Sequence, residues 1–169
     1  SIAVAPDAPP QVAILNPPTA SALGEMTLPL EASDDYGVEL GEARIALDLG
    51  SVTRAHGLTI EPEDRPGLVV PLPTPIAGDR AQFEENLIED FSEHPWANLP
   101  VTVVLSVLDA SEQAAETAPY QMVLPGRRFF DPLAAAVIEQ RRDLLWSREN
   151  TRSWVAITLA SATMPRRSG

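Results

Sequence analysis

The sequence predicts a mainly β fold: an immunoglobulin-like antiparallel β-sandwich of about seven strands with a short C-terminal helical segment. Between residues 9 and 125, short apolar runs alternate with turn-forming Pro, Gly and Asp, as in a sandwich or barrel. Beyond residue 126 the apolar residues recur at helical spacing. We therefore expect residues 9–125 to form the sandwich and residues 126–169 to form a helical tail, the start of a larger helical region.

The first elements are two strands and a turn. Residues 11–15 predict a strand that ends at an Asn-Pro-Pro sequence, residues 16–18, because proline cannot donate a ladder hydrogen bond. Residues 26–32 predict the next strand. Residues 34–37, Asp-Asp-Tyr-Gly, predict a turn, since Asp side chains bond nearby backbone amides and Gly accepts positive φ.

The middle of the domain contains three predicted strands, and residues 43–49 have the clearest pattern of the three. Residues 43–49 alternate apolar and polar side chains, which is typical of a strand with one buried face. Residues 68–70 are the one clear strand candidate in a stretch rich in Pro and Gly. Residues 82–91 place large apolar side chains four apart, so a helical turn competes with a strand there, and we favour the strand.

Two further strands complete the predicted sandwich. The Val- and Leu-rich run at residues 101–108 indicates a strand buried between two layers, and residues 120–124 form the last strand. Seven such runs in about 115 residues match an immunoglobulin-like sandwich.

The C-terminal segment begins with a helix signal. Asp131 is a suitable N-cap and Pro132 a suitable first helical residue. An apolar stripe follows, and a second helix is expected after Asn150. Two short helices cannot build an independent core, so they either dock on the sandwich or begin a longer helical region. We favour the second alternative.

The charge distribution divides the chain into two parts. Residues 1–125 hold four Arg against twenty Asp and Glu, a net charge of −16, and residues 126–169 carry a net charge of +4. An acidic body repels nucleic acids and anionic lipids, so we expect no nucleic-acid partner. No apolar run is long enough to cross a membrane, and any targeting signal is expected upstream of Ser1.

The sequence lacks the combinations of residues that most enzymes require. The chain has no Cys, which excludes disulfides and thiolate chemistry, and its two histidines, His56 and His94, both lie in expected loops. No nucleophile elbow, phosphate-binding loop or zinc-peptidase motif is present. Acidic pairs such as Glu84 and Glu85 would face opposite sides of a strand. We expect a protein that is not an enzyme and needs no cofactor.

One group of acidic residues suggests a metal site. In this connectivity the second and sixth strands end at the same pole, which would bring Asp34 and Asp35 towards Asp109 and Glu112. Oxygen ligands of this kind suit Ca²⁺. The alternative is that these acids only form turns, because the segment lacks the ligand spacing of an EF-hand loop.

Two aromatic residues suggest a different ligand. Trp96 and Tyr36 lie in expected loops, where they could form a platform for a sugar. The alternative is that they partly plug the core.

Several segments, in this order, resemble a known family. They are residues 33–38 (Ser-Asp-Asp-Tyr-Gly-Val), 98–100 (Asn-Leu-Pro), 108–113 (Leu-Asp-Ala-Ser-Glu-Gln), 124–134 (from Leu-Pro-Gly-Arg-Arg to Asp-Pro-Leu-Ala) and 138–142 (Ile-Glu-Gln-Arg-Arg). Together they resemble the central part of the domain of unknown function 4175 family of long alphaproteobacterial proteins. The resemblance implies a membrane-anchored protein whose long part lies in the periplasm, with the anchor outside this fragment, and it transfers no catalytic residue.

These observations favour a non-catalytic interaction or spacer domain of a membrane-anchored cell-envelope protein, with an unknown envelope protein as partner. The alternative is a ligand-binding module for calcium or cell-wall glycan. A third hypothesis is that an Arg-rich tail contacts anionic lipid. Its residues are Arg127, Arg128, Arg141, Arg142, Arg148 and Arg152.

Overall fold

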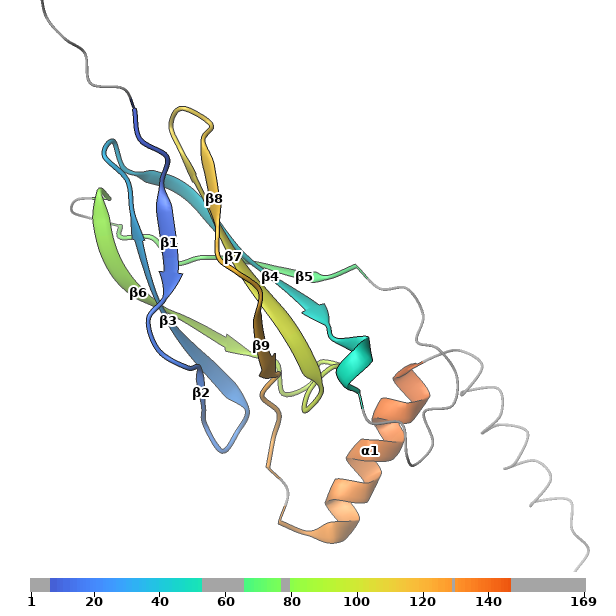
Figure 1. Cartoon of the computed structure of the whole chain (residues 1–169). Coiled ribbons are helices and arrows are strands. Elements are labelled where there is room, and N and C mark those ends of the chain that lie inside the picture. Colours follow the sequence, from blue (N-terminus) through green and yellow to red (C-terminus); the bar gives the residue numbers. More distant parts are fainter. Residues whose placement is uncertain (1–6, 53–65, 77–79, 129, 147–169) are drawn as a thin grey trace, which may run out of the picture. The chain divides into compact units, whose positions relative to one another are not determined.

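The computed structural model of the chain describes residues 7–52, 66–76, 80–128 and 130–146 (Figure 1). By their internal contacts the first three ranges belong to one compact unit, and residues 130–146 belong to a second. The first unit is mainly β, with two antiparallel sheets, and the second contains a helix. The predicted mainly β class with a short helical segment is confirmed.

The first sheet is built around β3 (Glu25–Ser33), one of its four strands. One side of β3 pairs along its whole length with β6 (Gln82–Asp90). The other side pairs first with β2 (Thr19–Ala20) and then with β1 (Gln11–Ile14). The prolines at 17 and 18 lie in the interruption between β1 and β2, as expected for residues that cannot donate to the ladder.

The second sheet has β4 (Val38–Leu47) and β7 (Pro100–Asp109) at its centre. β4 also pairs with β5 (Leu68–Pro71), and the far side of β7 pairs with β8 (Ala114–Glu116) and β9 (Tyr120–Val123). The β3–β6 and β4–β7 pairs are thus the longest in the two sheets of this β-sandwich.

The core comes from strict alternation on the two long central strands. On β3 and β7 every second side chain is buried, and the side chains between them are not. Full burial of one such aliphatic side chain contributes about 1.5–3 kcal/mol. The inward residues are Met26, Leu28, Leu30 and Ala32 on β3, and Val101, Val103, Leu105 and Val107 on β7.

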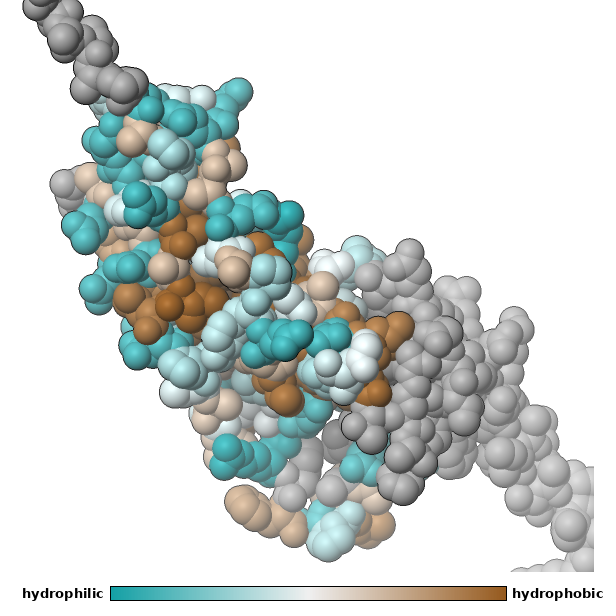
Figure 2. Space-filling model, viewed as in Figure 1, coloured by the Kyte–Doolittle hydropathy of each residue, from teal (hydrophilic) through white to brown (hydrophobic). Residues whose placement is uncertain are grey.

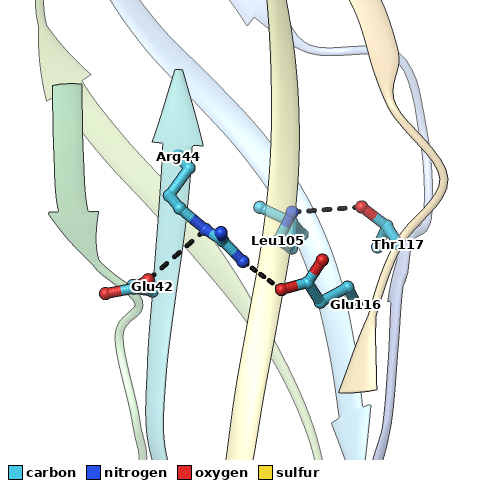
Figure 3. Close-up of polar contacts among 5 residues, drawn as sticks. All are labelled: Glu42, Arg44, Leu105, Glu116 and Thr117. Atoms are coloured by element: carbon cyan, nitrogen blue, oxygen red, sulfur yellow. Dashed lines mark hydrogen bonds and ion pairs between the residues drawn. The ribbon is translucent and has the colours of Figure 1, made fainter. Parts of the chain in front are cut away.

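The outer strand beside β7 is split into β8 and β9, and a side chain bridges the interruption (Figure 3). The Leu105 backbone N–H donates to the Thr117 hydroxyl at 3.0 Å, and the Thr117 N–H donates to the Leu105 carbonyl at 2.9 Å. Nearby, the exposed Arg44 guanidinium forms ion pairs with Glu42 on its own strand and Glu116 on β8. The hydroxyl thus replaces a ladder carbonyl where the strand is broken.

Most predicted elements are confirmed, and residues 82–91 form a strand rather than a helix. The sequence reading missed β2 and β8, which have two and three residues and show no periodicity. It also started β4 five residues late, because a register shift between Val38 and Leu40 interrupts the alternation.

The predicted helix start is also confirmed. Helix α1 (Pro132–Trp146) follows Asp131, whose Oδ1 accepts a hydrogen bond from the Leu133 N–H at 2.8 Å. Within α1 the apolar side chains of Leu133 and Val137 are exposed. The second predicted helix, after Asn150, lies outside the described residues.

The chain reaches the sandwich at one pole and leaves at the opposite one. β1 begins with Gln11 opposite Ser33, at the end of β3. After β9, the Arg128 N–H donates to the Ala22 carbonyl beside the start of β3, at 3.3 Å. Since β3 has nine residues, the two poles are about 27–30 Å apart.

The departing segment is fastened to the sandwich. Leu124, Pro125 and Gly126 are buried, and the Asn98 N–H donates to the Leu124 carbonyl at 2.8 Å. A Cβ on Gly126 would lie 2.8 Å from Asn98 Cγ, closer than real contacts allow. Attachment to the sandwich therefore continues past residue 125, the boundary expected from the sequence, to Arg128.

Candidate functional site at the acidic pole

Two buried carboxylates lie at the pole where the chain reaches the sandwich, and we call this end the acidic pole. Asp34 is 7% exposed and Asp109 is 2% exposed. In the described part of the chain, the buried polar or charged side chains are these two aspartates. Asp34 takes the next inward position after Ala32 in the first sheet, and Asp109 continues the buried series of β7 in the second. Both side chains therefore point into the end of the core.

Backbone pairing links the two carboxylate-bearing segments. Asp109 is the register partner of Val38, the first residue after the turn that Asp34 begins. That turn contacts the start of β6, because the Asp34 N–H donates to the Ala81 carbonyl at 2.8 Å. This topology places Asp34 and Asp109 at the same pole. Figure 2 shows hydrophilic side chains gathered at this end.

Each carboxylate uses one oxygen to close its own turn. Asp34 Oδ2 accepts a hydrogen bond from the Tyr36 N–H at 2.9 Å. Asp109 Oδ1 accepts from the N–H groups of Ser111 and Gln113, each at 2.8 Å. These are the local side-chain to backbone bonds for which Asp is favoured in turns.

The second oxygen of each carboxylate is buried without a partner. Asp34 Oδ1 and Asp109 Oδ2 have no hydrogen-bond partner, and the same is true of Oδ1 of Asp7. Asp7 precedes the segment whose Ala8 N–H donates to Asp35 Oδ2 at 3.4 Å, so it belongs to this pole. The sequence reading missed Asp7, which lies in no recognisable motif.

The other two predicted ligands lie differently. Asp35 and Glu112 are both exposed, and Glu112 has a left-handed φ of 63° in the turn after β7. Within the described ranges no three His, Cys, Asp or Glu side chains converge as they would in a preformed metal cage. A Ca²⁺ site formed by Asp34, Asp35, Asp109 and Glu112 therefore stays a prediction, with Asp34 and Asp109 as its buried members.

The two aromatic residues considered for sugar binding have different positions. Trp96 is 6% exposed, and its ring packs edge-on against His94 with centroids 5.1 Å apart. Tyr36 is 68% exposed in the turn at the acidic pole. The Trp96 ring is therefore part of the core rather than of a platform.

The two histidines of the chain, His94 and His56, were considered as candidate bases. His94 Nδ1 accepts a hydrogen bond from the Trp96 N–H at 3.1 Å, which fixes the imidazole in its turn. His56 lies outside the described residues.

The acidic residues of β6 alternate between its two sides, as expected for a strand. Glu84 is exposed, whereas Glu85 is at an inward position next to the buried Phe83 and Leu87 series. An inward-facing charge such as that of Glu85 on the edge strand β6 discourages pairing with another chain.

At the end of β6 the pKa of Asp90 lies below its usual value. The causes are the Ser92 side chain and the Ser92 backbone N–H, which donates a hydrogen bond to Asp90 Oδ1 at 2.8 Å.

A shallow groove of about 370 Å³ lies near the opposite pole. The edge strand β9 forms one wall, and Pro17, Pro18 and Arg128 lie among its other lining residues. A smaller hollow of about 240 Å³ lies over β1 and the end of β3. Neither contains a histidine or a pair of carboxylates, so neither resembles a site for acid–base chemistry.

These features define the class: a two-sheet antiparallel β-sandwich domain whose buried charged groups gather at one end. The particular family is shown by a family model, Domain of unknown function (DUF4175), that matches residues 1–168, so the chain belongs to that family. No curated protein matches the sequence. In the part of the chain that the structure describes, no helix is long and apolar enough to cross a membrane.

Proposed function

We propose that this chain is a non-catalytic interaction or spacer domain of a membrane-anchored cell-envelope protein. The observation that carries the proposal is the arrival and departure of the chain at opposite poles of the sandwich, Gln11 at one and Arg128 at the other. A domain whose two connections lie at opposite poles adds the distance between those poles to the length of the whole protein. The buried segment that includes Gly126 favours a fixed connection at the departing end.

The chemistry of the described residues supports a non-catalytic role. The two buried carboxylates, Asp34 and Asp109, accept hydrogen bonds that close their own turns, and His94 accepts one from the Trp96 N–H in its turn. Catalytic sites require a nucleophile, base or electrophile grouped in a cleft. Membrane attachment through segments outside this chain, a periplasmic location and an envelope protein partner are proposals that rest on the family resemblance.

The functional proposal is tested by replacement in the full-length protein. Residues 7–128 would be exchanged for an unrelated β-sandwich with ends at opposite poles, or for a flexible linker, and detergent sensitivity of the cells would be compared with that of a complete deletion. Rescue by the unrelated sandwich but not by the linker supports a spacer. Rescue by the native sequence alone supports an interaction domain, and affinity capture from solubilised envelopes would then identify the partner.

The location is tested by cysteine labelling, because this chain has no Cys. Ile88 is 55% exposed on β6, and Ala32, at 1% exposed, provides a matched buried control. A membrane-impermeant maleimide should label I88C, but not A32C, once the outer membrane is permeabilised. Labelling of I88C that requires lysis of the inner membrane would contradict a periplasmic location.

A further inference from the structure

We propose that the acidic pole binds a divalent cation, with Ca²⁺ as the best-matched ion, through the buried carboxylates of Asp34 and Asp109. The two groups come from different sheets and converge on the same end of the core. This inference is independent of the spacer proposal, whose main observation is the position of the two chain connections at opposite poles.

The first argument is the incomplete satisfaction of two buried charges. Asp34 Oδ1 and Asp109 Oδ2 have no hydrogen-bond partner, and the ion pairs formed by the described residues involve neither group. Arg80 contributes its backbone to this pole, but its side chain is exposed. Burial of an ionised carboxylate is costly unless the charge is paired or coordinates a metal. Two such groups at one pole favour neutralisation by one cation.

The second argument is that the turn bonds prepare the carboxylates for a ligand. Asp34 Oδ2 and Asp109 Oδ1 are engaged by backbone N–H groups, which fix each carboxylate and leave the opposite oxygen available. Ligands of a metal are commonly oriented by such secondary hydrogen bonds. The geometry therefore differs from that of an ordinary acidic surface, where both oxygens are solvated.

The third argument concerns the kind of ion. The available side-chain donors are two carboxylate oxygens, Asp34 Oδ1 and Asp109 Oδ2. Oxygen donors suit hard cations, and Ca²⁺ accepts variable geometry with carbonyls and water as further ligands. Since the described residues contain no three-acid cage, the affinity is expected to be weak, with Kd about 10⁻⁴–10⁻³ M.

The proposal is tested by thermal unfolding of the full chain after chelation, with CaCl₂ added at constant ionic strength. For the weak end of this range, about 10 mM Ca²⁺ should raise Tm by about 2–6 °C. D34N and D109N each keep an acceptor for the turn and remove the charge, so they should lose most of this rise. Glu84→Gln removes one exposed charge from β6 and should keep it.

The outcomes separate site binding from general screening of an acidic protein. No Ca²⁺-dependent rise in the wild type, or an equal rise in D109N and E84Q, would overturn the proposal. If the Asn variants fail to fold, terbium luminescence of the wild type decides, because the exposed Tyr36 lies two residues from Asp34 and can sensitise the ion. A terbium signal displaced by millimolar Ca²⁺ supports the site, and the lack of such a signal rejects it.

Discussion

Replacement of Thr117 by Val should destabilise the sandwich by about 1–3 kcal/mol, because it leaves a buried donor without an acceptor. Val has nearly the same shape as Thr and suits a strand, so packing changes little. Without the hydroxyl, the N–H of Leu105, a residue that is 0% exposed, has no partner at the break between β8 and β9. The backbone bond from Thr117 N–H to the Leu105 carbonyl remains.

Urea unfolding of the full chain measures this effect. T117S keeps the hydroxyl and should lose less than about 0.8 kcal/mol, roughly the value of one buried methyl group. Thr102→Val, at an outward position of β7, is the matched control for the same chemical change. If T117V costs less than about 0.5 kcal/mol, or no more than T117S, the side-chain bond does not hold the broken strand in place.

Three other substitutions test different parts of the sandwich. Gly24→Ala should cost about 1–3 kcal/mol because Gly24 has a left-handed φ of 97° and its Cβ would lie 2.9 Å from the backbone carbonyl carbon of Gly126, whereas Gly50→Ala, whose Cβ meets only an ordinary contact, should be nearly neutral in the same urea assay. Asp90 has a lowered pKa in the folded protein, so its stabilising effect is present above the unfolded pKa and is lost as pH falls through the folded pKa; the difference in urea midpoint between wild type and D90N should therefore disappear in acid. Glu116→Gln removes an exposed ion pair and should change stability by less than about 1 kcal/mol, with a larger loss pointing to a buried role for the pair.

The parts of the fold that were predicted are those in which burial sets the sequence pattern. The strand β7 was predicted from its Val- and Leu-rich run, which favours β structure. Only alternate side chains of β7 are buried, so the strand has one core face and is not covered on both faces as the run suggested. β2 and β8 are too short to show any period, and their pairing depends on the central strands beside them. The late start predicted for β4 has the same cause, since a register shift removes the pattern at Val38 and Leu40.

The candidate site was predictable only in part, for a related reason. Strand direction alone places Asp34 and Asp109 at one pole, and the inward phase of β3 and β7 then determines that both are buried. Asp35 and Glu112 lie in the same turns but are exposed, and Glu112 has a left-handed φ; composition does not reveal this exposure. Asp7 reaches the pole through the path of the preceding segment, for which no local motif exists.

The opposite positions of the two chain connections determine how the domain would respond to tension. β1 runs inward from the acidic pole and β9 runs outward to the other pole, so a pull on both ends acts along the axes of these strands. The hydrogen bonds to β3 and β7 would then be loaded together in shear instead of being opened one after another. Before β9 could slide, the hydrogen bond from the Arg128 N–H to the Ala22 carbonyl and the one from the Asn98 N–H to the Leu124 carbonyl would have to break. The sandwich is thus built to resist stretching along its long axis more strongly than peeling from its side.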